Sequence, residues 1–131
     1  MSPAAGFVLF LLLTLAFIAL AVLTGLRALR RAHIPAVAAT CASLAVTIFF
    51  AERLGELYDL GAAGIVTPIH LTLAKVTTLA YLLPIATGLA TIRASRHRKL
   101  HRRMAFSVIA LTVLTAGTGL TMILLAERLP A

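Results

Sequence analysis

Four long apolar stretches, separated by short charged segments, constrain what this chain can fold into more than any other feature. One charged side chain, Lys75, interrupts them, and they cover residues 6–26, 34–51, 68–92 and 104–126. A helix needs about 20 apolar residues to span the hydrocarbon core of a bilayer. Only 12% of the residues are charged, against about 25% in a typical soluble domain. We therefore predict an all-α integral membrane protein with four transmembrane helices in an up-and-down bundle, forming a single membrane domain over residues 1–131.

The distribution of lysine and arginine predicts how these helices are oriented. Nine of the twelve basic residues lie in two loops, at residues 27–33 and 93–103. An excess of Lys and Arg in short loops marks the cytoplasmic side, so both termini are expected outside the cytoplasm. Residues 1–26 contain no Lys or Arg, which argues against a cleaved signal peptide, because such a peptide begins with positive charges. The expected localisation is a bacterial inner membrane, crossed several times.

Local signals predict how the second and third helices end and begin. Apolar residues recur at helical spacing in the connector 52–66, so the second helix is expected to continue there as a short amphipathic segment until two glycines end it. Thr67 is a predicted N-cap for a third helix whose first residue is Pro68. Pro84 lies inside this third span and is expected to kink it, because proline has no N–H to donate to the preceding turn.

Lys75 is a charged residue inside a predicted span, and such residues need an explanation because they are costly in lipid. One interpretation is functional: an anion or proton site in a small oligomeric transporter. The other is that Lys75 extends to the outer interface and pairs with an acidic residue there. The candidate partners are Glu52, Glu56 and Glu127.

The four histidines are candidate cofactor ligands at the two membrane faces. His70 opens the third span at the outer face, and His33, His97 and His101 lie on the inner side. His97 and His101 are four residues apart and would share one face of a helix, which is a spacing that can hold a metal. His70 and His101 cannot ligate one haem, because the bilayer core of about 30 Å separates them.

The arginines around the inner histidines suggest a different interpretation, in which the loops contact anionic lipid headgroups. These candidate lipid-binding residues are Arg27, Arg30, Arg31, Arg98, Arg102 and Arg103. Short basic loops between apolar spans are explained by membrane topology, so we expect no nucleic-acid partner. The chain contains no nucleophile–base pair, phosphate-binding glycine loop or paired carboxylates, and this argues against an enzyme.

The segment from His70 to Gly119 resembles a pattern found in small bacterial membrane proteins. It begins with Ile69-His70, has Gly88 near the inner end of the third helix, and continues into Leu100-His101-Arg102-Arg103-Met104 and a final helix rich in Gly and Thr. This is similar to four-helix families of unknown function that include a cytochrome-oxidase assembly factor, and to predicted haem-b-type four-helix membrane proteins. The resemblance implies a role in oxidase maturation or membrane electron transfer, with His70 and His101 as site residues.

The first functional hypothesis is therefore an accessory protein of a respiratory complex, with haem b, copper or quinone as the candidate cofactor. The second is a structural or lipid-contacting subunit of a larger membrane complex, with a membrane-protein partner or a second copy of the chain. The third is the small transporter that Lys75 suggests.

Overall fold

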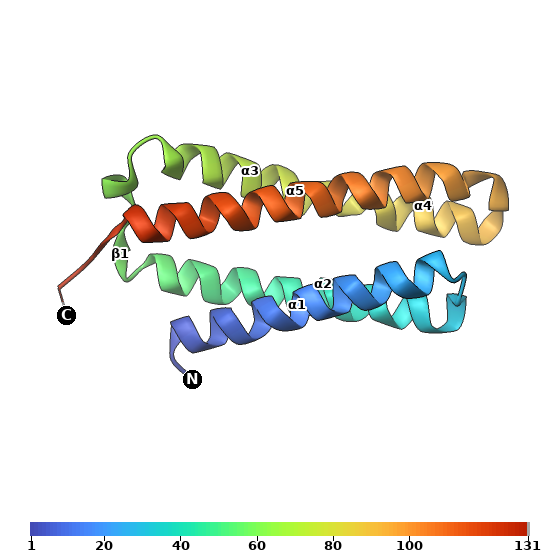
Figure 1. Ribbon diagram of the computed structural model, residues 1–131, viewed down its shortest axis with the longest axis horizontal. Helices are drawn as coiled ribbons and strands as arrows, with labels where there is room; N and C mark the ends of the chain where they lie inside the picture. Colours follow the sequence, from blue (N-terminus) through green and yellow to red (C-terminus); the bar gives the residue numbers. More distant parts are fainter. Residues whose placement is uncertain (131) are drawn as a thin grey trace. The chain divides into compact units, whose positions relative to one another are not determined.

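The computed structural model describes residues 1–130, and nearly all of them are helical (Figure 1). The helices are α1 (Pro3–Leu26), α2 (Arg30–Gly55), α3 (Val66–Ala80), α4 (Leu82–Arg93) and α5 (Arg98–Leu125). The remaining elements are two short 3-10 helices, η1 (Leu60–Ala63) and η2 (Ser95–His97), and two paired strands, β1 (Tyr58–Asp59) and β2 (Glu127–Arg128). Four helical segments, with α3 and α4 forming one, are long and apolar enough to cross a membrane. The prediction of four such segments is confirmed.

The chain divides into two compact units, of which the first is Met1–Tyr58. In this unit α1 and α2 lie side by side as an antiparallel hairpin (Figure 1). Hydroxyl groups hold the middle of the hairpin, because the Thr14 hydroxyl lies 2.8 Å from that of Ser43 and 3.1 Å from that of Thr47. The loop between the helices turns through Ala28, which has a left-handed φ of 56°.

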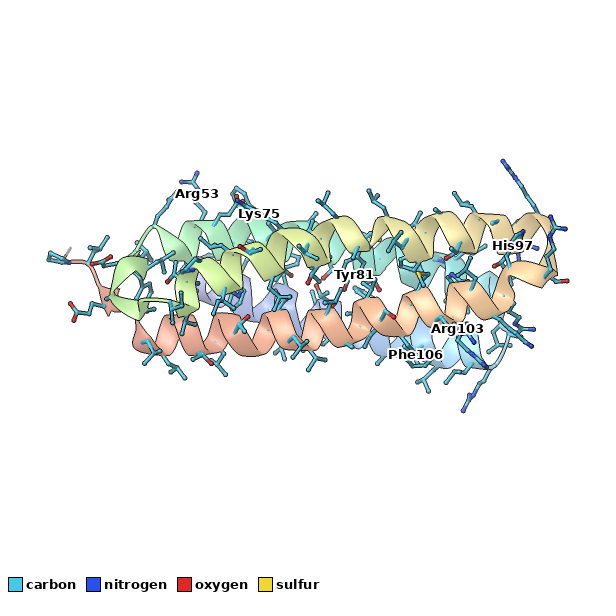
Figure 2. All side chains as sticks on the ribbon, turned by 90° about the horizontal axis from the view of Figure 1, so that it is seen from above. Arg53, Lys75, Tyr81, His97, Arg103 and Phe106 are labelled. Atoms are coloured by element: carbon cyan, nitrogen blue, oxygen red, sulfur yellow. The ribbon has the colours of Figure 1, made fainter. Side chains whose placement is uncertain are left out.

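The second unit begins at Asp59 and contains a similar hairpin. Here α5 is one arm, and α3 followed by α4 is the other (Figure 1). The Thr77 and Thr115 hydroxyls are 2.8 Å apart. Tyr81 lies between the two arms (Figure 2), with its hydroxyl 2.9 Å from the Thr112 hydroxyl.

The predicted kink at Pro84 takes the form of a break between α3 and α4. Tyr81 alone separates the two helices. The break is where it should be, because proline at position 84 cannot donate to the carbonyl of the residue four before it. This loosens the turn that ends at Pro84.

One local prediction in the connector holds in part, and another is wrong. Helix α2 continues past residue 51 as expected, but it ends at Gly55, before Gly61 and Gly64, and the chain then forms β1 and η1. Thr67 is not an N-cap, because α3 begins at Val66. Thr67 is the second residue of α3, and its hydroxyl donates to the Leu60 carbonyl of η1.

The packing places small hydroxyl residues inside each hairpin and large apolar residues outside. Buried polar residues include Thr14, Thr40, Ser43, Thr47 and Thr77. Many leucines are exposed, such as Leu79, Leu120 and Leu124. A water-soluble protein buries its leucines, whereas helices in lipid contact one another through small and hydroxylated residues. This distribution suits a surface surrounded by lipid or by other apolar helices.

Candidate functional site

Three of the four histidines lie in the same local arrangement, in which the imidazole ring packs directly on a glycine of the facing helix. The pairs are His33 of α2 with Gly25 of α1, His101 of α5 with Gly88 of α4, and His70 of α3 with Gly119 of α5. A Cβ atom added to these glycines would lie 3.1 Å, 3.2 Å and 2.8 Å, respectively, from the Cε1 atom of the histidine. A Cβ at Gly119 would therefore force the ring to move, and one at Gly25 or Gly88 would push the ring away by a few tenths of an ångström.

A threonine immediately precedes each of these glycines and contacts the same ring. The Nδ1 atoms lie 3.4 Å from the hydroxyl of Thr24, 3.3 Å from that of Thr87 and 3.1 Å from that of Thr118, for His33, His101 and His70 in turn. Each threonine also donates its hydroxyl proton to the carbonyl four residues earlier in its own helix, and the distances are 2.7 Å, 2.7 Å and 3.0 Å. The oxygen lone pairs of the threonine are thus left to accept from the imidazole.

A main-chain carbonyl is a second partner of Nδ1 in His33 and in His101. It lies at Ala21 for His33, at a distance of 2.9 Å, and at Pro84 for His101, at 3.0 Å. His70 hydrogen-bonds to the main chain of Thr115. In every case this residue is three before the threonine and four before the glycine. We call the set of carbonyl, threonine, glycine and facing histidine a Thr-Gly/His site.

This hydrogen bonding determines which ring nitrogen carries the proton. A carbonyl oxygen can only accept, so Nδ1 of His33 and of His101 must be the protonated nitrogen. The neutral ring then has Nε2 as its acceptor nitrogen. Histidines that ligate metals characteristically donate their other N–H to a carbonyl or carboxylate, which fixes the ring orientation. The Thr-Gly/His sites therefore have the outer-shell contacts of a metal-ligating histidine.

The three sites differ in the charges around them. His33 follows Arg30 and Arg31 at the start of α2, and His101 is followed by Arg102 and Arg103 in the first turns of α5. These arginine side chains are exposed. His70 has no charged residue within four positions of it in the sequence.

His97 does not share the arrangement of the other three histidines. It lies in η2, before α5 begins (Figure 2). Its Nε2 atom accepts from the Arg96 side chain at 3.3 Å, while the ring of His101 turns onto α4. Among residues 1–130, no group of three or more His, Cys, Asp or Glu residues is placed to hold a metal ion. The predicted pairing of His97 and His101 on one helix face is therefore not what their contacts show.

Lys75 is exposed, and its side chain points away from α5 (Figure 2). The one ion pair among residues 1–130 is Arg53–Glu56 within the first unit, at 3.4 Å. The expected pairing of Lys75 with Glu127 is thus not formed within the second unit. The charge of Lys75 is therefore directed toward the lipid or protein that surrounds this apolar helix.

No family model, curated protein or solved structure matches this chain. The resemblance to oxidase assembly factors and haem-b proteins therefore stays a prediction. The function of this protein therefore has to be inferred from the contacts of its histidines and charged residues.

The sequence contained a signal for these sites that residue-by-residue reasoning missed. Leu-x-x-x-Thr-Gly-Leu occurs three times, at residues 20–26, 83–89 and 114–120. The pairing of Thr-Gly with histidine becomes visible only when the facing helix is known.

Proposed function

We propose that this protein is a multi-pass accessory protein of a respiratory or electron-transfer complex, and that it binds haem b through histidine Nε2 atoms. The observation that supports this most directly is the Nδ1–H bond from His33 and His101 to a main-chain carbonyl. It holds the ring in the tautomer whose Nε2 can ligate iron. Haem, when bound, supplies a one-electron Fe(III)/Fe(II) couple.

The number of available ligands favours haem over copper. A porphyrin occupies four coordination positions of the iron, so the protein needs to supply one or two axial ligands. Copper and zinc sites usually take three or four ligands from the protein. Residues 1–130 offer no such group. A single well-oriented histidine in each Thr-Gly/His site suits the smaller requirement.

Quinone is supported less well than haem by the same hydrogen bonds. A quinone carbonyl is an acceptor and needs a donor from the protein. The N–H of His33 and that of His101 are already donated to main-chain carbonyls. The remaining nitrogen of a neutral ring accepts hydrogen bonds, so it complements a quinol hydroxyl but not a quinone.

The proposal includes a membrane orientation in which the basic loops face the cytoplasm of a bacterium. The arginines Arg27, Arg30, Arg31, Arg98, Arg102 and Arg103 are all exposed and form no ion pair within residues 1–130. In that orientation they are available to anionic headgroups, each contributing about 1 kcal/mol of attraction near the surface.

The test is an absorbance spectrum of the detergent-purified protein, before and after dithionite, and again after incubation with haemin. A Soret band and reduced α and β bands are expected. His97→Ala is the matched control, because His97 is an inner histidine outside the Thr-Gly/His sites, and it should bind haem like the unmodified protein. A protein that stays featureless in the visible range after haemin incubation would refute haem binding.

A second candidate function, a subunit docked to a larger membrane complex or a small oligomeric transporter, is favoured by Lys75. Its exposed charge has no ion-pair partner within the second unit, and an acidic residue of a partner or a second copy could supply one. Lys75→Met should then weaken co-purification of the partner, or transport in liposomes, while the helical content stays the same. A variant that retains both would exclude this role.

A further inference from the structure

Three exposed polar residues, Thr72, Lys75 and Thr78, lie on one surface of α3. They are spaced three residues apart, so consecutive members are neighbours on the helix surface. They lie away from the side on which the buried Thr77 bonds to Thr115 of α5. We call Thr72, Lys75 and Thr78 the polar face of α3.

The two hydroxyls of the polar face differ from every other threonine hydroxyl in the described chain. Within residues 1–130, the side chains of Thr72 and Thr78 form no hydrogen bond, whereas each of the other threonines forms at least one. Exposure does not explain the difference, because the exposed Thr121 of α5 donates to the Gly117 carbonyl at 3.0 Å. Unsatisfied polar groups are costly in lipid, so these two hydroxyls remain available to a partner outside the unit.

Lys75 has no carboxylate partner in any apolar span of this chain. Residues 6–51 and 60–126 contain no Asp or Glu. Lys75 is the tenth residue of α3, which places it about 13 Å along the helix axis from the first residue. A charged residue inside a membrane span is normally paired. Its counter-charge therefore has to come from another molecule, and a second copy of this chain has no acidic residue in its spans to offer.

Extension of the lysine side chain to the lipid headgroups does not account for the whole polar face. A lysine has a long stem that can carry its ammonium toward the interface. Thr78 has a short side chain and lies three residues farther along α3 than Lys75, about 4.5 Å deeper along the helix axis. A lipid phosphate that meets Lys75 at the interface would leave the Thr78 hydroxyl without a partner.

The chemistry of the polar face complements a carboxylate on an apolar helix. An ammonium group donates hydrogen bonds and accepts none, and a threonine hydroxyl can donate as well. A carboxylate has two oxygens and accepts from both kinds of donor, with added strength because the groups are charged. Leu71 and Leu79 border the polar face with 44% and 67% of their surface exposed, so the surface around it is apolar. Polar side chains bonded between apolar helices are a common means of association in membranes.

We infer that the polar face of α3 docks a transmembrane helix of a different membrane protein, and that this helix carries an Asp or Glu inside its apolar span. Lys75 pairs with that carboxylate, and the Thr72 and Thr78 hydroxyls donate to the same helix. The inference rests on the proposed role as a subunit docked to a larger membrane complex and is independent of haem binding. It adds the surface that docks and the chemistry of the partner.

The test uses a synthetic transmembrane helix of Leu and Ala with one Glu in its outer half, and an otherwise identical helix with Leu at that position. Binding of each peptide to the full-length protein is measured by fluorescence energy transfer in phosphatidylcholine vesicles. The Glu peptide should bind about tenfold more tightly than the Leu peptide, as expected for a strong polar contact between helices. Lys75→Met should abolish this preference. Thr72→Val and Thr78→Val should each weaken binding of the Glu peptide about threefold.

Two matched variants separate the polar face from polarity or charge in general. Thr121→Val removes an exposed hydroxyl that is already bonded within its own helix, so it should leave binding unchanged. Lys75→Met combined with Gly117→Lys moves the charge to α5, at a position where nothing lies within 4 Å of an added Cβ. This double variant should not regain the preference for the Glu peptide. Circular dichroism confirms the helical content of each variant.

Equal binding of the Glu and Leu peptides, or a preference restored by Gly117→Lys, would overturn the inference. Energy transfer between two labelled copies of the protein that depends on Lys75 would assign the polar face to a second copy instead. Loss of the Glu preference in vesicles that contain phosphatidylglycerol would assign it to lipid phosphates, and both results would also overturn the inference. A membrane complex that Lys75→Met still retains would refute the docked role itself, whatever the peptides show.

Discussion

Alanine at Gly119 and alanine at Gly117 should change stability in opposite directions, although the two residues lie close together in the same helix. A Cβ at position 119 would lie 2.8 Å from Cε1 of His70 and 3.3 Å from both of its ring nitrogens. Ordinary van der Waals contact begins at 3.4 Å, so the ring must move by about 0.6 Å. At position 117 nothing lies within 4 Å of the added atom.

The magnitude follows from three contributions. Moving the ring sacrifices the hydrogen bond between His70 and Thr118, which is worth about 1 kcal/mol. Overpacking costs about 1–3 kcal/mol. Replacing glycine by alanine inside a helix returns about 0.5–1 kcal/mol. Gly119→Ala should therefore destabilise the protein by about 1–3 kcal/mol, whereas Gly117→Ala should stabilise it by about 0.5–1 kcal/mol.

The assay is reversible unfolding of the detergent-solubilised protein by increasing mole fractions of sodium dodecyl sulfate, followed by circular dichroism. The two variants are compared with the unmodified protein in the same detergent. Equal shifts of both variants, or stabilisation by Gly119→Ala, would show that His70 does not pack on α5 through Gly119.

Three further predictions use the same unfolding assay. Ala28→Gly should raise the unfolding free energy by up to about 1 kcal/mol, because glycine adopts the observed φ of 56° without strain; a destabilised variant would contradict the loop conformation. Thr47→Val should cost about 0.5–1.5 kcal/mol by removing its bond to Thr14, and a neutral result would mean that this bond contributes nothing to the hairpin. Lys75→Met should not lower stability, since Lys75 is exposed without an ion pair in its unit; a loss above about 1 kcal/mol would reveal a buried partner.

The long-range apolar pattern was enough to predict the helices, because a run of about 20 apolar residues has few other solutions. Three of the four predicted spans lie within helical segments. The predicted fourth span extends to residue 126, just past the end of α5. The helices extend beyond most of the predicted ends, since polar residues such as Arg30 and Arg98 continue a helix as readily as apolar ones. The break before Pro84 was also predictable from the local sequence, because it depends only on the N–H group that proline lacks.

Features that depend on tertiary contacts were not predictable from local sequence. Thr67 has the chemistry of an N-cap, but α3 begins one residue before it, and its hydroxyl donates to the Leu60 carbonyl. The first span is almost entirely apolar, and yet Thr14 in its middle is only 1% exposed because it bonds two residues of α2. The partner of Thr67 is seven residues away, and the partners of Thr14 are 29 and 33 residues away in the facing helix.

A Thr-Gly dipeptide in a helix can position a facing histidine because of the way the threonine hydroxyl is hydrogen-bonded within its own helix. A threonine inside a helix donates to the carbonyl four residues before it, which leaves its oxygen free to accept but not to donate. The glycine that follows has no side chain, so the imidazole ring can approach the helix backbone. One turn of helix thereby presents two acceptors, the hydroxyl and a carbonyl, to the single N–H of the ring, as at Thr87 and Pro84 for His101. Under the proposed haem binding, a ring already fixed in tautomer and orientation would lose little further freedom on ligating iron.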